Sequence, residues 1–233
     1  MATPVFADEF VDFLALLTNA NQRRLLEHSR QVEAPAGSAP MRPGDARGAF
    51  LVRQGLIRSF WGAPDGRETT LTFIYPGNLL GAPSLVPGAA GLWGPFSSVG
   101  AHAVVDSTLT FLDLETARSV VSREIEVVSA LATVLAAFAR YSVRRFAVGS
   151  LGNIPERLAF DLLERASRSQ LYLGRLEARA THQDLADSIG SSREVVSRAL
   201  KDLRAAGIVE TAPGLTRVLD PMRLANIVRP YLI

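Results

Sequence analysis

The sequence predicts an α+β protein with an N-terminal antiparallel β-roll and flanking helices, one long helix, and a C-terminal helix-turn-helix with a wing. Three observations support this prediction. Glycine and proline separate short apolar runs between about residues 35 and 114, as in an antiparallel barrel or roll. Residues 117–149 contain no proline, and their apolar residues recur at helical spacing. The last third repeats that spacing around a glycine-serine turn. We expect domains over 1–116, 117–150 and 151–233.

The composition indicates a folded chain without a strong global charge. With 48% hydrophobic and 21% charged residues, the 233-residue chain can form a packed core in one large domain or two small ones. The formal net charge is only +2, so any surface for an anionic partner must be local. The chain has no cysteine, which excludes disulfides, cysteine-ligated zinc and iron–sulfur clusters.

The N-terminus predicts a helix and not a targeting signal, because "MATPVFADEFVDFLALL" has acidic residues where a signal peptide is basic. Its apolar residues continue at helical spacing to about residue 30. The most apolar later run, "SALATVLAAF", is shorter than the roughly 20 residues of a membrane span. We therefore expect a cytoplasmic protein without a membrane partner.

The β-roll is predicted from strand-like segments such as "AFLVRQGLIRSFWG" and "ETTLTFIYPGNLLG". Asp65-Gly66 lies between these two segments and predicts a tight hairpin turn. The following segment 117–149 predicts one helix of about 45 Å, longer than a small roll can cover. A second copy of the helix alongside would bury the remaining apolar stripe, so we expect a homodimer through residues 117–150. The alternative is that the stripe only covers the roll.

The segment "THQDLADSIG" predicts a short helix, with Thr181 as its N-cap and Gly190 in the left-handed conformation at its end. Ser192 is suited to cap the next helix. Leu185 and Ile189 face inward, and the small Ala186 allows the two helices to approach closely. Together these features predict a helix, a tight turn and a second helix that presents its polar side.

The second helix groups long hydrogen-bonding side chains within an arc of about 140°. Arginine can donate two bonds to a guanine edge, and glutamate can accept from a cytosine amino group, so this face suits the DNA major groove. The alternative is a plain solvated helix stabilised by an i,i+4 pair between Glu194 and Arg198. A wing follows as two strands around Ala212-Pro213-Gly214, where Thr216 or Arg217 could contact the DNA backbone. The arc comprises Arg193, Glu194, Ser197, Arg198 and Lys201.

The stretch "THQDLADSIGSSREVVSRALKDLRAAGIV" resembles the Crp/Fnr family of bacterial transcription regulators, and "LVRQGLIRSFWGAPDGRETTLTFIYPGNLLG" matches the family's roll more loosely. The resemblance implies a cyclic-nucleotide-binding-domain-like jelly roll, a dimerisation helix and a winged helix-turn-helix. It also implies a homodimer that binds a palindromic DNA site and contacts RNA polymerase. The polymerase contact in relatives lies at the loop that corresponds to Ser169–Glu177.

The resemblance assigns two groups of DNA contacts. Arg193, Glu194 and Arg198 stand where the cyclic-AMP receptor branch contacts bases, while Glu194, Ser197 and Arg198 match the Fnr branch. A TGTGA-like half-site is favoured, and a TTGAT-like one stays open. The resemblance places Thr181, His182, Gln183 and Ser192 at or beside contacts with the DNA backbone. We expect two further backbone contacts, Lys201 from the polar face of the helix and Arg217 from the wing.

The sensor half departs from the family pattern. Gly81 is retained, but Ala82 stands where the family's glutamate binds a ribose, and Ser97 stands at the phosphate-binding arginine. Ser98 and Ser142 remain as polar candidates for an effector pocket. Without the glutamate for the ribose and the arginine for the phosphate, we do not expect cyclic AMP as the effector. The family's iron–sulfur cluster is excluded by the missing cysteines.

We expect no haem, because the candidate ligands His28 and His102 are interpreted as ordinary surface or packing residues. An unidentified small effector, or control by abundance alone, remains. The chain has no phosphate loop, nucleophile elbow, zinc-protease motif or dinucleotide fingerprint, so we do not expect an enzyme and assign no catalytic or metal-binding residue. The alternative function is a ligand-binding or adaptor module of the same fold without DNA regulation.

Overall fold

The computed structural model describes residues 11–44, 48–88 and 98–231. Its contacts divide the chain into two compact units, Val11–Phe138 and a C-terminal unit that begins at Ala139. The division falls inside the longest helix, so the last part of that helix belongs with the C-terminal unit. The sequence instead predicts a separate helical segment over 117–150 that ends before the C-terminal domain. These domain limits stay a prediction.

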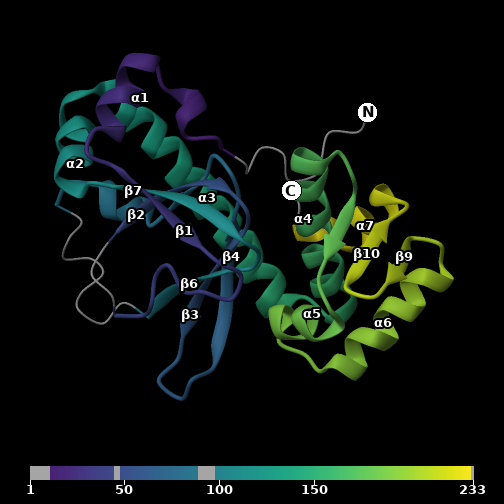
Figure 1. Cartoon of the computed structure of the whole chain (residues 1–233). Helices are drawn as coiled ribbons and strands as arrows, with labels where there is room; N and C mark the ends of the chain where they lie inside the picture. The colour runs from purple at the N-terminus through teal and green to yellow at the C-terminus, as the bar shows by residue number, and fades with distance from the viewer. Residues whose placement is uncertain (1–10, 45–47, 89–97, 232–233) are drawn as a thin grey trace. The chain divides into compact units, whose positions relative to one another are not determined.

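The N-terminal unit is the expected β-roll, made of two antiparallel sheets (Figure 1). The strand order is β1-β7-β2-β5 in one sheet and β4-β3-β6 in the other. The turn around Asp65-Gly66 joins β3 to β4, which confirms the predicted hairpin. The strands are β1 (Arg30–Ala34), β2 (Ala49–Gln54), β3 (Ile57–Gly62), β4 (Glu68–Ile74), β5 (Leu79–Leu80), β6 (Val99–Ala103) and β7 (Ser107–Leu112).

Strand β2 shows why the roll holds together, because both of its faces are buried. Phe50 and Val52 point into the roll and pack with residues of both sheets, including Ile57 and Leu109. Ala49 and Leu51 point the other way, into a core shared with the helices. Side chains alternate along a strand, so four consecutive apolar residues supply two separate cores.

Helices cover the outer face of the β1-β7-β2-β5 sheet. They are η2 (Leu14–Leu16), α1 (Asn19–Leu26), η3 (Ala82–Leu85), α2 (Leu114–Arg123) and the first part of α3 (Ile125–Leu151). The Glu126 carboxylate accepts hydrogen bonds from Thr18 and Asn21, which attaches the start of α3 to the start of α1.

The prediction of one unbroken helix over 117–149 is wrong at its start. Glu124 is extended, with φ −109° and ψ 106°, and it ends α2. Its carbonyl accepts from the amides of Val127 and Val128 and so begins α3. Its carboxylate pairs with Arg24 at 2.5 Å. The break depends on these tertiary contacts, and no glycine or proline marks it in the sequence.

The C-terminal unit is a winged helix-turn-helix. A core of apolar side chains joins the helices to the small antiparallel sheet β8-β10-β9. Helix α4 continues to Leu173, so most of the loop expected over Ser169–Glu177 is helical, because no helix breaker precedes Gly174. The elements are α4 (Ile154–Leu173), β8 (Glu177–Arg179), α5 (His182–Ile189), α6 (Arg193–Ala205), β9 (Val209–Ala212), β10 (Leu215–Val218), α7 (Pro221–Ile227) and η5 (Arg229–Tyr231).

Candidate nucleic-acid interface

The turn between α5 and α6 has the geometry that its sequence predicts. Thr181 and Asp184 form a reciprocal capping box at the start of α5. Gly190 ends α5 with φ +64°, a left-handed conformation that glycine adopts without steric cost. The Ser192 hydroxyl accepts from the amide of Val195 and caps α6. The capping box fixes where α5 begins, and Gly190 followed by the Ser192 cap fixes where α5 ends and α6 begins.

Helix α6 divides into a packed side and a presented side. Val196, Leu200 and Leu203 are buried, whereas Val195 is exposed. The arc predicted from the sequence is on the other side and is mostly open to solvent. Its exposed members are Arg193, Glu194, Arg198 and Lys201.

The charged groups of this face are available for a partner. Within the described part of the chain, no ion pair joins Glu194 to Arg198, so the pairing expected of a plain solvated helix does not form. Hydrogen bonds from its own backbone amide and from Ser192 lower the pKa of Glu194, so its carboxylate is ionised near neutral pH. An ionised glutamate is an acceptor only, as contact with a cytosine amino group requires.

Ser197 differs from the other members of the arc. It is half-buried, and its Oγ lies 2.7 Å from Nδ1 of His182, the first residue of α5. This hydrogen bond crosses between the two helices of the motif. Sequence reasoning placed the two residues in separate contact groups, and their 15-residue separation gave no signal of the bond.

The remaining expected backbone residues are already engaged in local structure. Thr181 and Ser192 are the two N-caps, and Gln183 donates to Asp187 at 2.7 Å. In the wing, Arg217 contacts the carboxylates of Glu210 at 2.9 Å and Glu177 at 3.3 Å. Thr216 is buried, so it cannot serve as the backbone contact considered for the wing.

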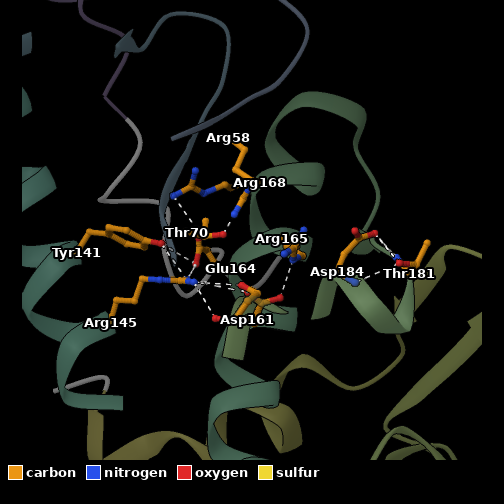
Figure 2. Close-up of polar contacts among 11 residues, drawn as sticks. Arg58, Thr70, Tyr141, Arg145, Asp161, Glu164, Arg165, Arg168, Thr181 and Asp184 are labelled. Carbon is orange, nitrogen blue, oxygen red and sulfur yellow. Dashed lines mark hydrogen bonds and ion pairs between the residues drawn. The ribbon is translucent and has the colours of Figure 1, made fainter. Parts of the chain in front are cut away.

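A buried polar cluster holds the end of α3 against α4 and α5 (Figure 2). Arg145 donates to the Glu164 carboxylate at 3.1 Å and to the Ser188 hydroxyl at 3.1 Å. The Tyr141 hydroxyl donates to the same carboxylate at 2.9 Å, and Ser188 donates to Asp161. Three helices of the C-terminal unit are therefore joined by one set of charged groups, which neither periodicity nor motif predicts.

The charges in this cluster compensate one another. Burial is the largest influence on Asp161 and would raise its pKa. The charges of Arg165 and Arg145, together with hydrogen bonds from Arg165 and Ser188, outweigh burial, so the pKa is lowered. Burial raises the pKa of the Tyr141 hydroxyl, which stays protonated and can donate. Arg165 lies 2.6 Å from Asp161, and Arg168 lies 3.1 Å from Glu164.

Among the described residues of the N-terminal unit, the predicted effector positions Gly81, Ala82 and Ser98 carry no charged side chain. Ala82 is buried in the core with Phe13 and Leu85, at the position expected for a ligand-binding glutamate. Gly81 has φ +75°, and a Cβ there would lie 2.2 Å from the Gly48 carbonyl oxygen, which explains why glycine is needed. Ser98 precedes β6 and is half-buried, Ser142 lies on α3, and Ser97 is outside the described residues.

Comparison with known proteins assigns the family. Residues 156–227 match the model of the Crp-like helix-turn-helix domain, and residues 31–124 match that of the cyclic nucleotide-binding domain. The cyclic AMP receptor protein of Thermus thermophilus is 31% identical over 194 residues, which cover 83% of this chain and 85% of that protein. The chain belongs to the Crp/Fnr family of transcription regulators.

Another relative and two solved structures are also similar to this chain. The CRP-like cAMP-activated global transcriptional regulator of Mycobacterium tuberculosis is 28% identical over 211 residues, covering 88% of this chain and 91% of that protein. A Crp/Fnr regulator structure from Thermus thermophilus has a TM-score of 0.67 at 25% identity, covering 86% and 98% of the two chains. The fold of FixK2 from Bradyrhizobium japonicum matches with a TM-score of 0.71 at 21% identity, covering 85% and 96%. The chain is a DNA-binding transcription regulator of this family.

Proposed function

We propose that the protein acts as a homodimer on a palindromic duplex site, with α6 of each copy in the major groove. The observation that supports this most directly is the presented side of α6. Arg193 and Arg198 are exposed beside an ionised Glu194, and no ion pair within the described residues links the three. Two arginines suit guanine edges, and the glutamate suits a cytosine amino group. Ser197 supplies the fourth base contact.

The proposed backbone contacts are at the N-terminal ends of α5 and α6 and at one position farther along α6. Thr181, His182 and Gln183 open α5, where free amides and the helix dipole favour a phosphate. Ser192 does the same for α6, and Lys201 is exposed two turns along it. Arg217 is left out of this set, because two carboxylates of the wing already compensate its charge.

Helix α3 supplies the support for a dimer. Ile125, Val128, Val143 and Phe146 are exposed and fall within about 60° of one another at 100° per residue. Between them, Ala132, Leu135 and Ala139 fill the same stripe, so every step along it is three or four residues, as in a two-helix coiled coil. We call these seven residues the α3 stripe. The small alanines at its centre allow two backbones to approach closely.

Helix α3 is long and apolar enough to cross a membrane, which differs from the expectation that no apolar run reaches that length. One helix of this kind is weak evidence for a membrane span. Its last turns include Arg145, which contacts Glu164 and Ser188 of the folded C-terminal unit. An arginine held in this way favours a dimer in the cytoplasm over a membrane span. RNA polymerase is the further partner proposed for a regulator of this family.

The roll is proposed to bind a small effector other than cyclic AMP, or none. Relatives are named for cyclic AMP, but in this chain the Ala82 methyl is part of the core and cannot bind a ribose. A site for the phosphate would also require a cation that the retained Ser98 does not provide. Haem is not proposed, because His28 and His102 lie beside Glu27 and Glu68 at the surface.

Selection of bound sequences from random duplex DNA tests this function, with purified full chain at several salt concentrations. We expect an inverted repeat and an affinity that falls steeply as salt rises. Arg193→Ala should cost about 1–3 kcal/mol at one base pair and relax the preference there. Arg67→Ala, which removes an exposed charge from the roll, is the matched control. Enrichment of no sequence, or a preference that Arg193→Ala leaves unchanged, would contradict the proposal.

A further inference from the structure

The hydrogen bond between His182 and Ser197 connects a proposed phosphate contact with a proposed base contact. Nδ1 of His182 and Oγ of Ser197 are 2.7 Å apart. Both side chains are half-buried, so each keeps an open side. His182 is the first residue of α5, and Ser197 lies one turn into α6.

The second ring nitrogen of His182 is free for another partner. Among the described residues, no hydrogen bond to Nε2 is found. Of its neighbours, Thr181 caps the helix and Gln183 donates one amide hydrogen to Asp187. The imidazole therefore keeps Nε2 as an uncommitted hydrogen-bonding atom at this helix end.

A neutral imidazole carries one N–H, and the partner of one nitrogen decides the role of the other. A phosphate can only accept, so Nε2 must carry the proton when it contacts one. Nδ1 is then an acceptor, and the Ser197 hydroxyl donates its single hydrogen to Nδ1. Ser197 is left with lone pairs, so toward a base edge it acts as an acceptor and not as a donor.

We propose that His182 is a positioning residue that makes Ser197 an acceptor, so that Ser197 selects a base with an amino group in the major groove. Those groups are N6 of adenine and N4 of cytosine. This inference rests on the proposed contacts of α5 and α6 with DNA. It adds that Ser197 accepts a hydrogen bond from the base and that His182 causes it to do so. A regulator without this bond would leave the serine able to donate or accept.

The test uses the full chain and the selected palindrome, with all four base pairs placed in turn at the position that Ser197→Ala affects. We expect Ser197→Ala and His182→Ala each to reduce discrimination at that one position by about 5-fold, the worth of one hydrogen bond. The double variant should be no worse than either single variant. His182→Phe keeps the ring volume without nitrogens and should behave as His182→Ala, and thermal unfolding checks that each variant is folded.

Base analogues test the polarity directly. Purine in place of adenine, or 2-pyrimidinone in place of cytosine, removes the amino group alone. Wild-type protein should lose about 5-fold in affinity on that duplex, and Ser197→Ala should lose nothing further. If Ser197 instead favours guanine or thymine oxygen, or if the two substitutions act additively at different positions, the inference is wrong.

Two controls separate this inference from the proposed function. Arg198→Ala should change the preference at another base pair, and Arg67→Ala, at an exposed residue of the roll, should leave all base preferences unchanged. If Arg198→Ala has no effect on any sequence, the proposed DNA contacts of α6 fail. If Arg198→Ala acts as expected while His182 and Ser197 show no coupling, only the present inference fails.

Discussion

At the scale of single residues, Asp161 shows how a buried charge is retained in the C-terminal unit. Its side chain is only 2% exposed, and it accepts from Arg165 and Ser188 while Arg145 lies nearby. Desolvation of such a group is costly, and removal of one partner usually costs more than the pair contributes. The carboxylate therefore contributes stability only while its arginine partners remain and it stays ionised.

Asp161→Asn should lower the free energy of unfolding at pH 7 by on the order of 3 kcal/mol. Because the folded pKa of Asp161 is lowered, its stabilisation is fully present above the ordinary carboxyl pKa of about 3.9. It is lost as pH falls through the lower folded value. Urea unfolding at a series of pH values should show the wild type and the variant converging below about pH 4.

Asp202→Asn, at an exposed position on α6, is the matched control and should change the unfolding free energy little. A difference between wild type and Asp161→Asn that stays constant from pH 7 to the acid limit would contradict this account of Asp161.

At the scale of elements, capping residues in the sequence were sufficient to predict where α5 ends and α6 begins. Thr181 marks the start of α5 in the sequence, Gly190 and Ser192 mark the turn to α6, and the structure confirms all three. The break between α2 and α3 could not be predicted, because Glu124 is held extended by contacts from distant parts of the chain. The hydrogen bond between His182 and Ser197 could not be predicted from the sequence either, because each residue is independently explained as a surface residue of its own helix.

Two glycines, one just after α5 and one inside α3, should respond to alanine with opposite signs. At Gly190, φ is +64° with open space around a new Cβ, so Gly190→Ala should cost about 1–2 kcal/mol of stability from backbone conformation alone. At Gly149, inside α3 and equally open, alanine should stabilise by about 0.5–1 kcal/mol. Denaturant unfolding of both variants measures the difference. Equal effects of the same sign would show that φ does not control the response at Gly190.

At the scale of the whole molecule, the proposed binding of a palindromic site requires both the α3 stripe and the presented side of α6. A palindromic site has two half-sites, and one copy of α6 can contact only one of them. The exposed apolar residues of α3 explain how a second copy would be held, because in a single copy of the chain Phe146 is 74% and Val143 is 67% exposed to water. Association and DNA affinity should therefore be lost together.

Phe146→Glu should convert the protein from dimer to monomer in sedimentation equilibrium, because a carboxylate on the α3 stripe would be buried against its own copy. Affinity for the full palindrome should fall by at least about 100-fold, while affinity for a single half-site should stay the same, since only the linkage between two sites is lost. Met222→Glu, at a residue of α7 that is 61% exposed, is the matched control and should leave both measurements unchanged. A Phe146→Glu protein that remains dimeric and binds the palindrome normally would show that residues outside the stripe join the two copies.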